Sequence, residues 1–129
     1  MATSKENSPP ISLMAEEAIV AHRLVMVGVA ADSCLYTTAI TSGAVGVSLA
    51  TEASGESLAV QSTPGSVVKL TAQAAISVGD LLMPHSSGLG KVVTLSGATA
   101  TPVGRALQAA LADLDVIEVL FQPSNIGTA

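Results

Sequence analysis

The chain has 129 residues and a formal net charge of −5, and 49% of its residues are hydrophobic although only 2% are aromatic. This length suits one domain, whose core must come from aliphatic side chains because Tyr36 and Phe121 are the only aromatic residues. An acidic chain with five scattered basic residues has neither the basic stripe nor the aromatic platforms of a nucleic-acid binder. Charged residues are also scarce, at 12%, which indicates that further apolar surface is buried between subunits.

Secretion, membrane insertion and disulfide bonding are not expected either. Residues Met1–Pro10 are polar and lack the apolar stretch of a secretory signal. The longest apolar stretch, Ile19–Ala31, is interrupted by His22 and Arg23 and is too short to span a membrane. Cys34 is the only cysteine, so we expect no intrachain disulfide and a small buried side chain at this position.

The first twelve residues, 1–12, are expected to form a flexible arm ahead of the folded domain. Polar and charged residues fill 1–8, and Pro9-Pro10 favours an extended backbone. The arm is either a frayed terminus or a segment that orders on a neighbouring subunit, and the sequence favours neither. After the arm, Leu13–Ala21 contains good helix formers and is preceded by Ser12 as a cap, which predicts a short helix.

A recurring phrase marks the points where the chain turns into a new strand. It consists of a glycine, an acidic residue and an alternating apolar run, as in Gly55–Val60 and Gly79–Met83, and Asp113–Val119 repeats it without the glycine. Glycine tolerates the positive φ of a tight turn, and the acidic side chain bonds the amides of the turn. The apolar alternation that follows fits a strand with one buried face.

Many short apolar runs separated by Gly and Pro turns predict a β-barrel or β-sandwich. Pro64-Gly65 is a strong turn signal that predicts a hairpin between Ser57–Gln61 and Val67–Leu70. The segment 103–112 is rich in Ala and Leu, but Gly104 weakens a helix start, so a strand over 102–108 is favoured over a helix. The other predicted strands are Leu24–Val27, Asp32–Thr38, Gly43–Leu49, Asp80–Met83, Lys91–Leu95 and Val116–Phe121, ahead of a polar tail over 123–129.

Residues that carry chemistry are few. His22 and His85 are the only histidines, and no serine has a nucleophile-elbow motif, so a catalytic triad is not expected. Cys and His residues are too few and too far apart for a structural zinc site, and no calcium-loop or phosphate-binding motif occurs. We therefore expect no metal, no cofactor and no enzymatic activity.

Arg105 is the best polar candidate in the later half of the chain. Its expected role is an ion pair with a carboxylate from a turn, Asp80 or Glu118. Such a pair would fix register within the barrel or across a subunit contact.

Several short motifs occur in one order along the chain. They are Ala15–Ile19, His22–Val25, Gly46–Ser48, Gly55–Val60, Ala74–Leu82, Gly90–Val93 and Val103–Leu107. This ordered set resembles the capsid decoration, or cement, proteins of tailed bacteriophages, and the resemblance covers about 11–121. One departure is Leu114, where the family pattern leads us to expect a glycine turn.

The resemblance implies a non-enzymatic protein on the outer surface of a phage head, made in the bacterial cytoplasm. Its domain, 13–122, would be a small β-barrel or β-tulip with at most one or two short helices, commonly assembled as a homotrimer. Its partner would be the major capsid protein, whose neighbouring copies it would clamp on the expanded head. The arm residues expected to contact the capsid are Pro9, Pro10, Ile11, Leu13 and Met14.

Two other interpretations stay open. One is another virion component, such as a head fibre base or a tail module. The other belongs to a different class, a small ligand-binding β-clip module, which the segment Ile76–Leu81 also suits. A polar pocket with converging side chains would favour the second alternative.

Overall fold

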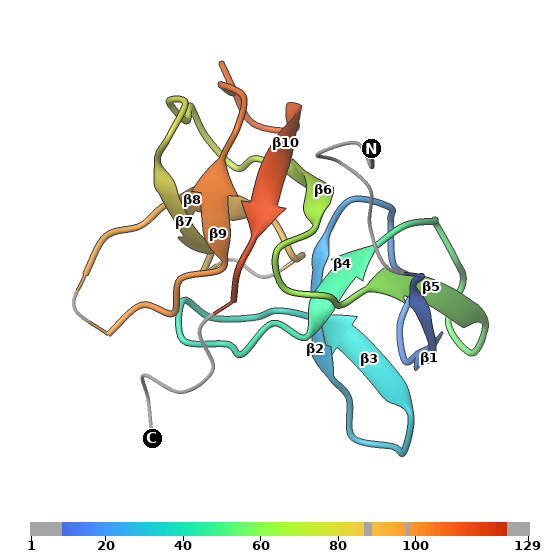
Figure 1. The fold of residues 1–129 in the computed structure, drawn as a ribbon. Coiled ribbons are helices and arrows are strands. Elements are labelled where there is room, and N and C mark those ends of the chain that lie inside the picture. Colours follow the sequence, from blue (N-terminus) through green and yellow to red (C-terminus); the bar gives the residue numbers. More distant parts are fainter. Residues whose placement is uncertain (1–8, 87–88, 98, 124–129) are drawn as a thin grey trace.

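Ten short strands form two sheets in the computed structural model, which describes residues 9–86, 89–97 and 99–123 (Figure 1). The first five strands form a closed barrel in the order β1-β3-β2-β4-β5, and the last five form a sheet in the order β6-β10-β9-β7-β8. Every regular element in these ranges is a strand, which confirms the expectation of a mainly β fold built on a small barrel. The strands are β1 (Ile11–Ala15), β2 (Leu24–Val27), β3 (Ser33–Tyr36), β4 (Gly46–Ser48), β5 (Ser57–Gln61), β6 (Val67–Thr71), β7 (Leu81–Pro84), β8 (Val92–Thr94), β9 (Gly104–Ala106) and β10 (Val116–Phe121).

Strand β1 takes up the first residues of the segment predicted as a short helix, and no helix follows it within that segment, so the prediction over Leu13–Ala21 is wrong. β1 is antiparallel to β5, with Leu13 beside Leu58, and parallel to β3, with Ala15 beside Cys34. It is the element that closes the barrel. Backbone pairing on both of its sides outweighs the helix preference of the Ala and Glu residues that follow.

The Pro64-Gly65 turn connects the two sheets, so the hairpin predicted across it is also wrong. β5 pairs with β1 and β4 in the barrel, whereas β6 pairs with β10 in the second sheet. The amide of Gly65 donates to the carbonyl of Phe121 at 2.7 Å, and the amide of Phe121 donates to the carbonyl of Ser66 at 2.9 Å. The turn itself is present, but a turn fixes only the local direction of the chain and not the partner of the next strand.

All three copies of the recurring phrase are turns that lead into strands. Gly55 and Gly79 have φ of 88° and 89°, and β5 and β7 begin two residues later. Asp80 acts as predicted, because its Oδ2 accepts a hydrogen bond from the amide of Ser77 at 2.9 Å. In the third copy Leu114 takes the left-handed conformation, with φ of 75°, although it is not a glycine.

Strand β9 lies within 103–112, which confirms the strand and shows that the helical alternative is wrong. β9 pairs with β10 on one side and with β7 on the other. A Cβ atom at Gly104 would collide with the carbonyl oxygen of Leu120 in β10. The glycine is therefore needed for the close approach of two backbones.

We expect Gly104→Ala to lower the free energy of unfolding by about 1–3 kcal/mol, because β9 must shift away from β10 to make room for the methyl group. Urea denaturation followed by circular dichroism measures this change. A denaturation midpoint equal to that of the unmodified protein would contradict the close approach.

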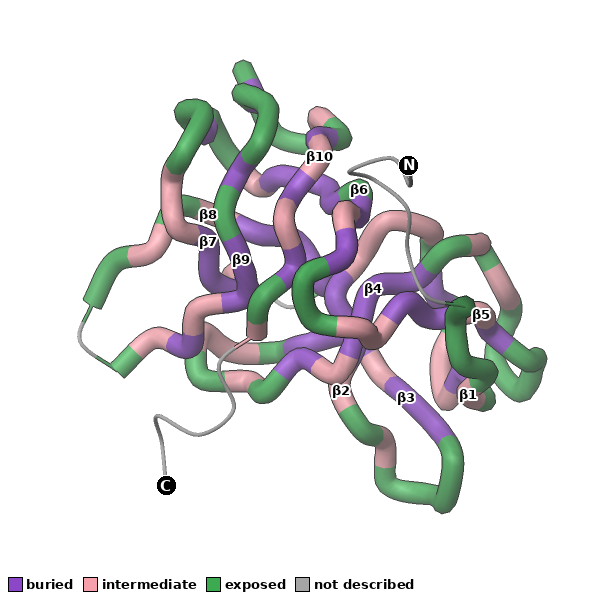
Figure 2. The backbone as a smooth tube through the Cα atoms, viewed as in Figure 1, coloured by how far each residue is buried: buried purple, intermediate pink, exposed green. Residues whose placement is uncertain are grey.

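Buried residues lie along the strands of both sheets (Figure 2). Their side chains form two groups, one within the barrel and one that spans both sheets. Leu24, Ala44 and Val47 belong to the barrel half of the chain but pack into the core of the second sheet. The two sheets are therefore joined by a shared core. The barrel group consists of Ala15, Ile19, Val25, Cys34, Tyr36, Leu58 and Val60.

Candidate functional site

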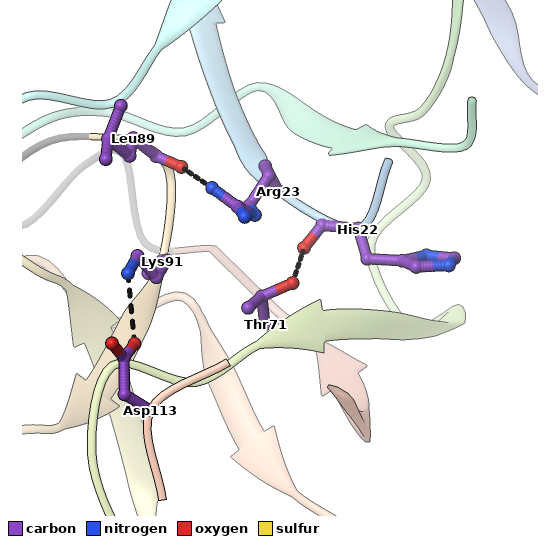
Figure 3. A network of polar contacts seen from close by, with 6 residues as sticks. All are labelled: His22, Arg23, Thr71, Leu89, Lys91 and Asp113. Atoms are coloured by element: carbon purple, nitrogen blue, oxygen red, sulfur yellow. Dashed lines mark hydrogen bonds and ion pairs between the residues drawn. The ribbon is translucent and has the colours of Figure 1, made fainter. Parts of the chain in front are cut away.

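Polar contacts join the barrel to the second sheet at one junction (Figure 3). The amide and hydroxyl of Thr71 in β6 both donate to the carbonyl of His22, at 2.9 and 3.0 Å. The Nη1 atom of Arg23 donates to the carbonyl of Leu89 at 2.9 Å. Because most of these partners are backbone carbonyls, the contacts serve to hold the two sheets together.

Lys91 and Asp113 form an ion pair beside this junction, with Nζ and Oδ1 3.0 Å apart. The Lys91 side chain is only 10% exposed, whereas that of Asp113 is 49% exposed. Exposed ion pairs contribute about 1 kcal/mol or less, but a buried ammonium group needs a partner. The pair therefore ties the loop between β9 and β10 to the start of β8.

The two histidines lie in different parts of the structure. Burial, together with the positive charge of Lys69, lowers the pKa of His22, so this imidazole is neutral at pH 7. His85 lies at the end of β7, where its amide donates to the carbonyl of Lys91 at 2.9 Å. The described residues contain no group of three or more His, Cys, Asp or Glu side chains placed to hold a metal ion. Within the same ranges no helix is long and apolar enough to cross a membrane.

The carboxylates of Glu16 and Glu17 brace the hairpin between β2 and β3. Glu16 Oε2 accepts hydrogen bonds from the amide of Ala30, at 2.7 Å, and from the hydroxyl of Ser33. Glu17 Oε2 accepts from the amide of Tyr36 at 3.1 Å. Sequence reasoning placed these residues in a helix and missed this role, because nothing local shows which distant amides a carboxylate will meet.

Cys34 is buried, as the sequence predicted, and it is a free thiol. Burial and the negative charges of Glu16 and Glu17 raise the pKa of this thiol. A reactive cysteine needs the opposite surroundings. Cys34 is therefore a protonated side chain of the barrel core.

We expect acidification to weaken the fold through Glu16. Its hydrogen bonds, first from Ser33 and then from the amides of Ala30 and Val29, lower its pKa in the folded state. The stabilisation is therefore fully present above about pH 4.3, the ordinary glutamate value, and is lost as the pH falls through the lower folded-state pKa. Between about pH 5 and pH 3, the melting temperature of Glu16→Gln should fall less than that of the unmodified protein. The same pH dependence in both proteins would contradict this role.

The arm residues expected to contact a capsid do not share one environment. Pro9 and Pro10 are exposed and precede β1. Ile11 and Met14 belong to β1 and are 45% and 40% exposed. Leu13 packs against the core of the barrel. The role of these residues in capsid contact stays a prediction.

Arg105 lies in β9, between β10 and β7. Its Nη1 atom donates to the carbonyl of Gly79 at 3.0 Å, immediately before Asp80. The carboxylate of Asp80 accepts a hydrogen bond from the hydroxyl of Thr94 at 2.9 Å. Glu118 lies in the neighbouring strand β10. The structure thus brings the three residues to one sheet, and the ion pair of Arg105 with Asp80 or Glu118 stays a prediction.

Two sets of exposed apolar residues lie at opposite ends of the molecule. One is in the hairpin between β2 and β3, and the other is in the turn before β7, the loop between β9 and β10 and the start of β10. The backbone is exposed at both ends in Figure 2. The hairpin carries Val27 and Val29, which are 65% and 94% exposed, and we call these two residues the barrel tip. Sequence reasoning did not single out either end as a contact surface. The other end, which we call the sheet tip, consists of Val78, Leu107, Leu111, Leu114 and Val116.

Comparisons with known proteins agree with the resemblance read from the sequence motifs. Residues 4–121 match the family described as phage cement protein. No curated protein sequence matches the chain. Among solved structures, the fold is similar to the crystal structure of the head fibre gp8.5 N base of bacteriophage phi29, with a TM-score of 0.69, 18% sequence identity, and coverage of 87% of this chain and 92% of that chain. The structural likeness shows a shared fold, and the family match spans nearly all of the described residues. The chain therefore belongs to the phage cement protein family.

Proposed function

We propose that the protein is a structural, non-catalytic component of the virion that binds the outer surface of the phage capsid. There it stabilises the expanded head by clamping neighbouring copies of the major capsid protein. The observation that carries this proposal is the match to the phage cement protein family over residues 4–121. The apolar tips at two ends of a body with a shared core support it, because a clamp needs separate contact points that are held at a fixed distance.

The direct test is to add the purified protein to expanded capsids that were assembled without it. We expect saturable binding to expanded capsids, weaker binding to unexpanded ones, and a higher temperature of capsid disruption once the protein is bound. Failure to bind expanded capsids refutes the proposal. Binding without any change in the disruption temperature refutes the clamping role.

We further propose that the protein assembles as a homotrimer through the outer face of the second sheet. Register places Val67 beside Leu120, and Arg105 beside both Leu120 and Leu81. The aliphatic members of this set are half-buried in the isolated chain and surround an exposed arginine. A symmetric assembly would cover these side chains and would multiply modest capsid contacts into high avidity.

Arg105→Ala tests this face, because the substitution removes the charged side chain at its centre. We expect a weaker trimer in sedimentation velocity experiments at micromolar concentration and a lower melting temperature. An unchanged melting temperature together with unchanged assembly would remove Arg105 from this role. A strictly monomeric unmodified protein would contradict the trimer itself.

The first residues of the chain are proposed to contribute to capsid contact separately from the fold. β1 begins at Ile11 and pairs with β5 from that residue onward. Deleting residues 1–9 should therefore reduce capsid binding with little change in the melting temperature. Deleting residues 1–13 also removes most of β1, so it should lower the melting temperature as well. Equal loss of stability in the two deletions would show that the first residues are part of the fold.

The base of a head fibre is the second candidate function. The likeness of the fold to the head fibre N base of phage phi29 favours it. A cryo-electron microscopy map of the virion separates the two functions. Fibre density that continues outward from this domain supports the fibre base, whereas a domain that ends at the capsid surface supports the cement protein.

A further inference from the structure

Leu114 combines a strained backbone with an exposed apolar side chain. Its φ is 75° and its side chain is 60% exposed. A leucine in the left-handed region is strained, whereas a glycine there is not. The equivalent positions of the other two turns are Gly55 and Gly79, which have the same sign of φ. Strained positions persist where the surroundings enforce them, and they are concentrated at functional sites.

Hydrogen bonds enforce the conformation of the loop that carries Leu114. The Oδ2 atom of Asp115 accepts from the amides of Leu111 and Ala112, at 2.8 and 3.2 Å. The amide of Leu114 donates to the carbonyl of Ala72 at 2.8 Å, and the amide of Ala72 donates to the carbonyl of Asp115 at 2.8 Å. A surface fixed in this way before binding loses little conformational entropy when a partner docks.

The two carboxylates of this loop already have partners inside the molecule. Asp113 pairs with Lys91, and Asp115 bonds the backbone of its own loop. The most exposed large apolar side chains of the loop are Leu111, which is 86% exposed, and Leu114. Exposed apolar side chains of this kind fit into an apolar recess on a partner.

The size of the sheet tip decides whether it binds another copy of this chain or the surface of a larger assembly. Its five side chains together equal about three fully exposed aliphatic side chains, or roughly 200–350 Å² of apolar surface. Each partner in a stable complex of two proteins buries about 800 Å². The sheet tip is therefore too small to hold copies of this chain together by itself. It suits a small contact that is repeated by every subunit of an assembly on a larger surface.

We propose that Leu111 and Leu114 form an apolar anchor that inserts into a recess on the major capsid protein. This inference rests on the proposed capsid-binding function and names the surface through which the binding occurs. The hydrogen-bonded loop holds the anchor in place.

Leu114→Gly and Leu111→Ser test the anchor in binding to expanded capsids assembled without the protein. Leu114→Gly also removes the backbone strain, so this variant should fold at least as stably as the unmodified protein. Leu89→Gly is the matched control, because Leu89 is also left-handed, with φ of 63°, and 51% exposed, but lies in the loop between β7 and β8. We expect capsid affinity to fall about tenfold for each anchor variant and about a hundredfold for the two combined, with no change for Leu89→Gly.

Each other outcome overturns a different statement. If the unmodified protein does not bind expanded capsids, the proposed function itself fails. If it binds and both anchor variants bind equally well, the function stands and the anchor is wrong. If Leu89→Gly loses as much affinity as Leu114→Gly, the effect is not specific to the loop between β9 and β10. If the anchor variants dissociate in sedimentation velocity, the surface is a contact between copies of this chain.

Discussion

Phe121→Ala is expected to lower the free energy of unfolding by about 3–5 kcal/mol. Phe121 is the only phenylalanine in the chain and is fully buried at the end of β10. Its side chain belongs to the core group that spans the two sheets and includes Leu24 and Val47 of the barrel. Its backbone pairs with Gly104 of β9 and bonds the turn that connects the sheets. The substitution therefore opens a cavity at the place where the two sheets meet.

Domains of this kind have a total stability of about 5–15 kcal/mol, so the expected loss is a large part of the whole. Urea denaturation followed by far-ultraviolet circular dichroism measures it. Phe121→Leu is the control, because it keeps most of the volume and should cost about 1.5 kcal/mol or less. A loss below about 1 kcal/mol for Phe121→Ala would mean that the shared core does not depend on this side chain.

Local signals in the sequence predicted where strands begin but not how the strands pair. Gly55 and Gly79 have the positive φ that the recurring phrase requires, since a tight turn depends only on a few neighbouring residues. The two wrong predictions, the helix over Leu13–Ala21 and the hairpin across Pro64-Gly65, concern segments whose structure depends on which strands lie beside them. β1 is a strand because β3 and β5 lie on either side of it, and no pattern within β1 contains that information.

The candidate contact surfaces were only partly predictable for a similar reason. The sequence marked Leu114 as a departure from an expected glycine, and that position is strained in the structure. It did not show that the side chain is exposed or that Asp115 bonds the amides of Leu111 and Ala112. The contact between Glu16 and the β2–β3 hairpin was not predictable either, because Glu16 and Ala30 are brought together only by closure of the barrel.

Gly90→Ala is expected to lower the free energy of unfolding by about 2–5 kcal/mol, because it disturbs the junction between the sheets. Gly90 has φ of 68°, a conformation that strains any residue with a Cβ atom. The added Cβ would also collide with the carbonyl oxygen of Leu24 and lie 2.9 Å from its amide nitrogen. That amide donates to the carbonyl of Gly90 at 2.8 Å, so the collision falls on a hydrogen bond that joins the barrel to the second sheet.

Gly55→Ala separates the two causes, because Gly55 has φ of 88° but, apart from Gly55 and its two chain neighbours, no residue has an atom within 4 Å of the position of an added Cβ. It should show only the backbone strain, about 1–2 kcal/mol, and the excess loss in Gly90→Ala measures the collision at the junction. Tyr36, the only tyrosine in a chain without tryptophan, reports on the barrel through its fluorescence. In the unmodified protein this signal and far-ultraviolet circular dichroism should give the same urea midpoint, since a shared core makes the two sheets unfold together. In Gly90→Ala the two midpoints should separate. Equal losses in the two variants, with coincident midpoints in both, would show that a Cβ atom at Gly90 does not disturb the junction.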